Sequence, residues 1–271
     1  MQALRHLLLA LQYFTRIPLP HRLAQWVGYS PAQQAACMRH FPAVGAVLGL
    51  IAASVLYGVF QALPALHATP WIAAILSTAT VIYLTGALHE DGLADLSDGL
   101  GGTANREHAL AIMKDSRIGS FGALALLLAV FLKVALLVAL VQVNLNQALV
   151  SVFMGHVCSR WSPLWIVALL PHARPPEQSK SSFADQGTPW LNVGVGGLWV
   201  GATLVFGFIA LGIEPLVLAL LGLALPSVWM FCVLKRRLQG FTGDALGATQ
   251  QLSELGFYLG VLCASAAWAQ G

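Results

Sequence analysis

Carboxylate side chains are crowded into one short polar stretch, HEDGLADLSDGLGG, which spans residues 89–102. If this stretch is helical, Asp91, Asp95 and Asp98 follow the spacing i, i+4 and i+7, so all three share one face. Neighbouring carboxylates about 5–6 Å apart repel each other by roughly 3 kcal/mol at an effective dielectric constant near 20. No lysine or arginine lies between residues 64 and 105 to offset this repulsion locally. The stretch therefore predicts either protonated carboxylates or a bound cation.

Hard oxygen ligands on one helix face suit Mg²⁺ or Mn²⁺, which bind a few carboxylates, water and substrate phosphates. We predict Asp91, Asp95 and Asp98 as metal ligands, and Glu90, on another face, as a further ligand or a supporting group. A solvated acidic helix end is the alternative that requires no metal. Against that alternative, the chain has only eleven acidic residues, and four of them fall within these nine positions.

Two further polar stretches are suited to complete such a site. IMKDSRIGSFGA, residues 112–123, sets Asp115 between Lys114 and Arg117, and GFTGDALGA, residues 240–248, sets Asp244 among glycines. Carboxylates and cationic side chains together can hold a metal ion with a diphosphate. The basic run at 235–237 either anchors a helix at the membrane surface or binds substrate, and the sequence leaves both interpretations open.

The elements that must position these residues are membrane helices. The chain has 271 residues, of which 58% are hydrophobic and only 9% charged, whereas soluble domains average about 25% charged residues. A membrane-spanning helix needs about twenty apolar residues, and such runs recur along the chain. We predict an all-α, polytopic integral membrane protein, with residues 1–271 forming a single transmembrane catalytic domain. About seven spans are expected, near 41–63, 70–88, 119–142, 147–170, 189–213, 215–234 and 252–269.

The basic residues give an orientation for these spans. With seven spans, twelve of the fourteen lysines and arginines fall on one side of the membrane, which the positive-inside rule makes the cytoplasmic side. The acidic stretch lies on the same side, so we expect an active site that faces the cytoplasm. The twelve residues are Arg5, Arg16, Arg22, Arg39, Arg106, Lys114, Arg117, Arg174, Lys180, Lys235, Arg236 and Arg237.

The two remaining basic residues lie inside predicted spans, where charges are costly and usually face a cavity or a partner. A structural pairing and a functional role are both open for Lys133. Arg160 follows His156 by four residues, which puts both side chains on one helix face. We expect Arg160 and His156 to line a cavity open to the cytoplasm and to contribute to substrate binding.

The cysteines, the net charge and the N-terminal segment limit which binding partners and which cellular location we expect. Cys37, Cys158, Cys232 and Cys263 are far apart and form no CxxC pair, so neither a disulfide framework nor a zinc site is expected. The net charge of +3 reflects the basic flanks of membrane helices, so the predicted partner is the lipid bilayer and not nucleic acid. Residues 1–20 read as an interfacial helix or a short lead-in segment, and not as a cleavable signal. The sequence leaves open whether the chain forms a homo-oligomer.

Several motifs in chain order resemble the cobalamin synthase family, the adenosylcobinamide-GDP ribazoletransferases. They run from about residue 12 to 255 and comprise FTRIPLP, RHFPAVG, HEDGLADLSDGLGG, IMKDSRIGSFGALAL, GHVCSRW and GFTGDALGA. The resemblance implies that adenosylcobinamide-GDP reacts with α-ribazole 5′-phosphate or α-ribazole. The products would be adenosylcobalamin 5′-phosphate or adenosylcobalamin, together with GMP. It also implies a bacterial cytoplasmic membrane.

The resemblance, combined with the spacing, suggests a role for each residue. Lys114, Arg117 and Arg160 would hold the diphosphate, and Asp115 would complete the metal site. The general base would be Asp115, Asp244 or His89, which the sequence does not rank. DLSDG at 95–99 also resembles the DxxDG core of CDP-alcohol phosphotransferases, but Gly119 stands where a later aspartate is expected, so those residue roles are not carried over.

Two other classes of function fit a polytopic membrane chain. An ion-coupled transporter would place its acidic residues and broken helices near the bilayer midplane, whereas here the acidic stretch is predicted at the membrane edge. A scaffold or assembly factor would need no metal and would release no product.

Overall fold

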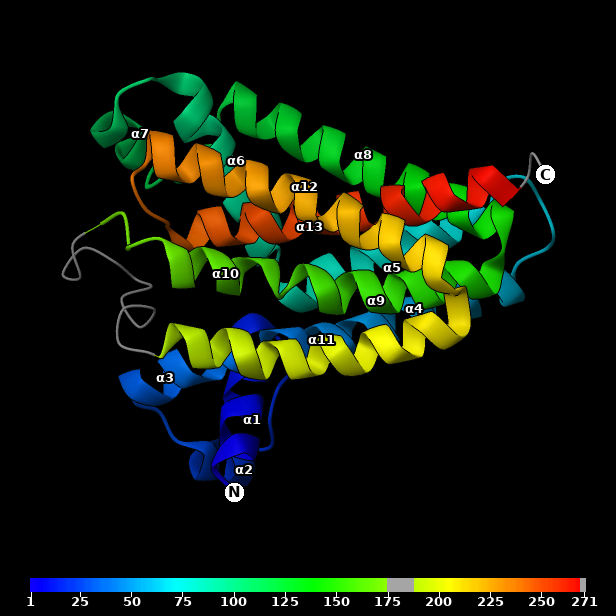
Figure 1. The fold of residues 1–271 in the computed structure, drawn as a ribbon, viewed down its shortest axis with the longest axis horizontal. Coiled ribbons are helices and arrows are strands. Elements are labelled where there is room, and N and C mark those ends of the chain that lie inside the picture. The colour runs from blue at the N-terminus through cyan, green and yellow to red at the C-terminus, as the bar shows by residue number, and fades with distance from the viewer. Residues whose placement is uncertain (175–187, 269–271) are drawn as a thin grey trace.

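The computed structural model describes residues 1–174 and 188–268, with side chains through residue 264. In this described part every regular element is helical, apart from one isolated parallel bridge between His172 and Phe241. Seven long helices run roughly along the long axis of the molecule (Figure 1): α4 (Phe41–Ala62), α5 (Thr69–Thr85), α8 (Ser120–Val143), α9 (Leu145–Ser159), α11 (Pro189–Leu211), α12 (Ile213–Arg237) and α13 (Gly243–Trp268).

Shorter helices gather mainly at one end of this bundle, at the left in Figure 1, where α6 and α7 also lie. Helix α1 packs against α3 and α4 and buries Leu9, Ala10 and Phe14. The shorter elements are α1 (Gln2–Phe14), α2 (His21–Val27), α3 (Pro31–Cys37), a 3₁₀ turn (Met38–His40), α6 (Leu88–Gly102), α7 (Arg106–Ile112) and α10 (Ser162–Leu169).

The prediction of an all-α polytopic membrane protein is confirmed. In the described residues, four helical segments are long and apolar enough to cross a membrane, or five if the bent pair α5 and α6 counts as one span. A long helix lies at each expected span, but α9 is interrupted before α10, and α13 carries polar side chains in its middle. The count of seven spans therefore stays a prediction. The four segments are Pro31–Ala62, Ser120–Val143, Pro189–Leu211 and Ile213–Arg237.

The chain turns sharply between α5 and α6. Gly86 and Ala87 both adopt left-handed backbone angles, with φ of 65° and 58°, and the two helices meet at an angle of 86°. An alanine in this region costs roughly 1–2 kcal/mol, so the surrounding packing must hold the turn. The helix over the acidic stretch is therefore not a straight continuation of the span predicted near 70–88. Instead, α6 crosses the end of the bundle (Figure 1).

Basic side chains tie the loops together at this end. Arg106 donates from Nε to the Leu238 carbonyl (2.7 Å) and from Nη2 to the Ala173 carbonyl (2.6 Å). Arg237 donates to the carbonyls of Leu100 (3.1 Å) and Thr103 (2.7 Å). Such charge-assisted bonds are stronger than neutral ones. These arginines thus close the end of the bundle, a role beyond anchoring it to a membrane surface. Lys180 lies outside the described residues.

Small residues allow the long helices to approach one another closely. A Cβ atom added at Gly49 would lie 2.9 Å from the Phe153 carbonyl oxygen of α9, and one at Gly45 would collide with the carbonyl of His156. The glycines of residues 45–49 therefore serve helix packing, as small residues do in membrane bundles. Cys37 and Cys158 are buried free thiols, and Cys232 and Cys263 are exposed free thiols.

Candidate active site

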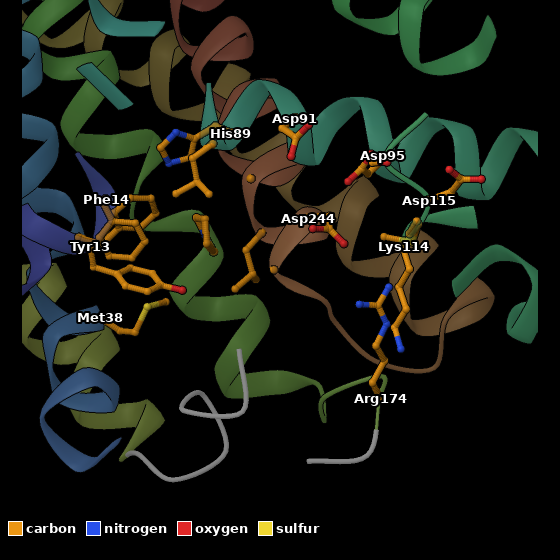
Figure 2. Close-up of a pocket in the computed structure, with 18 residues that line it drawn as sticks. Tyr13, Phe14, Met38, His89, Asp91, Asp95, Lys114, Asp115, Arg174 and Asp244 are labelled. Atoms are coloured by element: carbon orange, nitrogen blue, oxygen red, sulfur yellow. The ribbon is translucent and has the colours of Figure 1, made fainter. Parts of the chain in front are cut away.

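A cavity of about 790 Å³ opens at the end of the bundle that α6 crosses. Figure 2 shows a charged region at one side and an aromatic region at the other. The lining residues come from five α-helices, the 3₁₀ turn and the loops between them: Tyr13, Phe14, Met38, Phe41, Leu88, His89, Asp91, Asp95, Met113, Lys114, Asp115, Ser116, Pro163, Arg174, Gly243, Asp244, Leu246 and Gly247.

Three carboxylates face this cavity from two helices. Asp91 and Asp95 project from α6 toward Asp244 in the first turn of α13 (Figure 2). The two helices can approach because residue 92 is glycine, where an added Cβ would lie only 2.6 Å from the Asp244 carbonyl oxygen. The glycine of the acidic motif thus brings carboxylates together that are about 150 positions apart in sequence.

The carboxylates are crowded and poorly neutralised. Burial, followed by the charges of Asp91, Asp244 and Asp98, raises the pKa of Asp95 to about 6. Among the residues that the structure describes, no salt bridge shorter than 4.0 Å involves Asp91, Asp95 or Asp244. A cation bound between them would lower this repulsion.

Cationic side chains lie at the other side of the charged region. Lys114 and Arg174 both line the cavity, away from Tyr13, Phe14 and Met38 (Figure 2). Nη2 of Arg174 donates to the Leu110 carbonyl (3.1 Å), and its Nε is buried with no hydrogen-bond partner among the residues that the structure describes. Sequence reasoning missed Arg174 as a site residue, although its place after the fourth predicted span put it on the same side as the acidic stretch.

Asp115 and Arg117 form an exposed pair. Nη2 of Arg117 lies 2.6 Å from Oδ2 of Asp115, and the hydrogen bonds from Arg117 lower the pKa of Asp115 to about 2. Asp115 lines the cavity but Arg117 does not, and the Arg117 side chain is 87% exposed. The structure therefore brings Asp115 and Lys114 to the site and leaves Arg117 outside it.

Asp98 faces away from the cavity, although it shares α6 with Asp91 and Asp95. Its two carboxylate oxygens accept hydrogen bonds from the backbone nitrogens of Gly119 and Gly122, both at 2.7 Å. These are the first amide groups of α8, which otherwise have no partner within the helix. The carboxylate predicted as a metal ligand thus caps the N-terminus of α8.

Three other predicted site residues lie in a buried polar network between α6, α8, α9 and α13. Glu90, His156 and Arg160 are all at least 93% buried and do not line the cavity. The expected cavity lined by Arg160 and His156 is therefore not the cavity that holds the aspartates. At the centre of the network is Glu254, which sequence reasoning missed. The sequence feature that could have indicated it is the pair Gln250 and Glu254, two polar residues four positions apart in an apolar run, where polar side chains usually have partners.

Glu254 is surrounded by partners. Its Oε1 lies 2.7 Å from Nζ of Lys133 and accepts from the Tyr258 hydroxyl at 2.9 Å. Its Oε2 accepts from Nε2 of Gln250 at 2.6 Å and lies 3.4 Å from Nδ1 of His156. The structural alternative left open for Lys133 is thus the one observed. The network continues from Gln250 through Gln251 to Oε1 of Glu90, with a last bond of 3.0 Å.

His89 lies on the aromatic side of the cavity (Figure 2). The imidazole ring stacks on Phe41 with centroids 5.6 Å apart, and Phe41 stacks on Phe14 at 4.2 Å. The three rings come from α6, the start of α4 and the end of α1. The structure thus separates His89 from Asp115, which lies on the charged side of the cavity (Figure 2).

The donor set fits a divalent cation that takes most of its ligands from outside the protein. In the described residues, no group of three or more His, Cys, Asp or Glu side chains is arranged to hold a metal alone. Mg²⁺ commonly takes only one or two carboxylates and fills its remaining positions with water and phosphate oxygens. Asp91 and Asp95, which face an open cavity beside Lys114 and Arg174, meet that requirement.

The fold and the site describe a polytopic membrane enzyme whose cavity combines carboxylates with cationic side chains. The family model described as cobalamin-5-phosphate synthase matches residues 6–262. The chain therefore belongs to this family, and the resemblance seen in its motifs is confirmed. The family does not support the alternative of an ion-coupled transporter.

Curated relatives agree with the family over nearly the full chain. An adenosylcobinamide-GDP ribazoletransferase of Polaromonas sp. is 48% identical, with 96% of this chain and 97% of the relative covered. A protein of the same name from Albidiferax ferrireducens is 46% identical, with 96% and 98% covered. No solved structure matches the chain.

Proposed function

We propose that this protein transfers the cobinamide phosphate group of adenosylcobinamide-GDP to a ribose hydroxyl of α-ribazole or α-ribazole 5′-phosphate, and releases GMP. The proposal rests on the chain's membership of the cobalamin-5-phosphate synthase family. The observation that carries it at the residue level is the convergence of Asp91, Asp95 and Asp244 with Lys114 and Arg174 in one cavity.

The chemistry is a displacement at one phosphorus atom. The ribose oxygen forms a bond to the phosphorus that carries the cobinamide, and the bond from that phosphorus to the bridging oxygen breaks. GMP leaves with the bridging oxygen, and the hydroxyl proton passes to a base on the protein. The barrier is lowered mainly by positioning and by neutralising charge on the phosphoryl oxygens.

The residues divide these tasks by their position. Asp91 and Asp95 would hold Mg²⁺ or Mn²⁺, which when bound neutralises phosphoryl charge. Lys114 and Arg174 bind the diphosphate oxygens through N–H donors. Asp244, which faces the two metal-binding carboxylates, accepts the hydroxyl proton. Asp115 is the weaker base because Arg117 holds its pKa near 2.

The reaction is proposed to occur at the cytoplasmic side of a bacterial membrane. Residues 106–117 and 235–244 lie at the same end of the bundle as the cavity (Figure 1), and this end is rich in lysine and arginine. Thiol labelling tests the orientation: Glu107→Cys in inverted vesicles should react with a membrane-impermeant reagent, with the wild-type chain as the control. Labelling in intact cells and not in inverted vesicles would reverse the orientation.

The activity is tested with the purified full-length protein in detergent or nanodiscs. We expect GMP release only when adenosylcobinamide-GDP, a ribazole acceptor and a divalent cation are all present. Chelation should stop release, and Mg²⁺ added in excess should restore it. Release that persists in the chelator would remove the metal from the proposal, and no release under any condition would overturn the transfer reaction.

A further inference from the structure

The aromatic side of the cavity has no task in the transfer of the phosphate. Tyr13 and Phe14 at the end of α1 meet edge to face, with centroids 4.9 Å apart, and Phe14 stacks on Phe41. Met38 and His89 complete this side. In Figure 2 the Tyr13 ring extends toward the middle of the cavity, and the aspartates lie across from it. One side of the cavity is therefore lined by aromatic and apolar side chains that can pack against a flat ring.

A buried polar atom points to a ligand at this side. His89 is only 3% exposed, and its Nε2 is buried without a hydrogen-bond partner in the described residues. Leaving such an atom unpaired costs roughly 1–3 kcal/mol. An aromatic ligand with one polar ring atom would supply the missing partner.

The distance along α6 suits a nucleoside. His89 and Asp95 are six residues apart, which is about 9 Å along the helix axis. A base packed beside His89 thus brings its ribose hydroxyls next to Asp91, Asp95 and Asp244, where the attack on phosphorus takes place. Stacking of a base on aromatic side chains contributes about 1–3 kcal/mol per base.

The substrates of the proposed reaction offer three bases, namely the guanine of GDP, the adenine of the adenosyl group and the benzimidazole of α-ribazole, and their polar edges differ. Adenine, like guanine, carries an amino group and several ring nitrogens that need hydrogen-bond partners. Guanine carries several donors and acceptors, and burying them against Tyr13, Phe14 and Met38 would leave most of them unpaired at a substantial cost. The methylated benzimidazole of α-ribazole is apolar except for one bare ring nitrogen. That nitrogen can accept a hydrogen bond from Nε2 of His89.

We propose that Tyr13, Phe14, Met38, Phe41 and His89 form the subsite for the benzimidazole base of the ribazole acceptor. This assignment rests on the proposed transfer reaction for the identity of the ligand. Tyr13 stacks on the base, and His89 is a substrate-binding residue that recognises the bare ring nitrogen. The corrinoid and its guanosine diphosphate then occupy the charged side.

The Tyr13 side chain gives the cleanest test because it is 40% exposed and its removal leaves the core intact. Tyr13→Ala should raise the KM for α-ribazole 5′-phosphate about tenfold or more and change the KM for adenosylcobinamide-GDP less than twofold. Tyr13→Phe, which keeps the ring, should restore the wild-type KM. Tyr29→Ala, which removes a 69% exposed tyrosine outside the cavity, is the matched control.

His89→Phe keeps a ring and removes the nitrogen. It should raise the KM for the natural acceptor several-fold, but not the KM for an analogue in which dimethylindole replaces the benzimidazole. An equal loss with both acceptors would overturn the hydrogen bond to His89. A rise in the KM for adenosylcobinamide-GDP in Tyr13→Ala, with the acceptor KM unchanged, would assign the subsite to the corrinoid substrate and overturn the proposal.

A direct measurement of acceptor binding tests the subsite independently of the proposed transfer reaction. Calorimetric titration of α-ribazole 5′-phosphate into wild-type protein and Tyr13→Ala, without the corrinoid, should show at least about tenfold weaker binding to the variant. Equal affinities, or no binding to the wild type, would overturn the subsite even if GMP is released normally. Failure of GMP release together with weaker binding to Tyr13→Ala would overturn only the transfer reaction.

Discussion

Two regions of this protein hold carboxylates in an apolar chain, and the two differ in whether those carboxylates have charged or hydrogen-bonding partners. Asp91, Asp95 and Asp244 face an open cavity, and no salt bridge within the described residues neutralises them. Glu254 is 99% buried, and both of its oxygens have partners, including Lys133 at 2.7 Å. Asp244 and Glu254 are ten residues apart on α13, or about 15 Å along its axis.

This difference distinguishes carboxylates that are available to bind a ligand from carboxylates that stabilise the packing of the helices. A buried charge is tolerated when its partners replace water, and removing one partner then costs several kcal/mol. A charge left without partners at a cavity costs stability and is retained where a ligand supplies the partner. Lys133, Glu254 and Tyr258 thus belong to the architecture of the bundle, whereas Asp91 and Asp95 face the cavity in which we propose that the reaction takes place.

The largest expected effect is on activity, at the cavity. Asp95→Asn should reduce GMP release about a thousandfold, since metal-based stabilisation of the transition state is worth several kcal/mol. The midpoint of thermal unfolding should stay the same or rise, because the variant removes a charge that its neighbours Asp91 and Asp244 repel. Glu107→Gln, an exposed acid outside the cavity, is the control. A rate near that of the wild type would remove Asp95 from the metal site.

The second effect is on stability, in the buried network. Lys133→Met should lower the free energy of unfolding by about 3–5 kcal/mol, because it leaves Glu254 without its nearest cation. Measurement of denaturation in detergent would check this value. The double variant Lys133→Met/Glu254→Gln should recover more than half of the loss. If the double variant is less stable than the single one, the pair is not the stabilising unit.

The third effect is on substrate binding, and it should differ between two cationic side chains that are three residues apart. Lys114→Gln should raise the KM for adenosylcobinamide-GDP about tenfold, since a hydrogen bond to a charged group contributes roughly 1.5–3 kcal/mol. Arg117→Gln should change it less than threefold, because Arg117 lies outside the cavity and pairs with Asp115. Equal effects of both changes would return Arg117 to the substrate site.

The smallest effect is expected at Asp98, which caps α8. Asp98→Ala should lower the free energy of unfolding by about 1 kcal/mol, the usual cost of losing a helix cap. The rate of GMP release per folded molecule should stay within threefold of the wild type, because the carboxylate faces Gly119 and Gly122. A loss of activity as large as that of Asp95→Asn, in a folded protein, would restore Asp98 to the metal site.

The class of fold and several residues that line the candidate site were predictable from the sequence. Long apolar runs require membrane helices because the backbone must satisfy its own hydrogen bonds in lipid. The crowding of Glu90, Asp91, Asp95 and Asp98 marked a stretch of chain from which Asp91 and Asp95 line the cavity. Carboxylates in an apolar chain are costly, so they indicate a structural or functional role. Spacing alone did not separate the four, because the faces of α6 differ only in what packs against them.

The sequence by itself determined which side chains are present, where the long apolar segments lie and which family the motifs indicate. Only the tertiary structure decided the surroundings of each charge. The left-handed turn at Gly86 and Ala87 carries α6 across the bundle, so Asp91 and Asp95 meet Asp244 and the cavity. The same packing places Asp98 at the N-terminus of α8, where it accepts a hydrogen bond from the Gly119 amide. It also places Glu90 in the buried network around Glu254, through a hydrogen bond from Gln251. Burial and neighbours set the role of a carboxylate, and both arise only when distant segments meet.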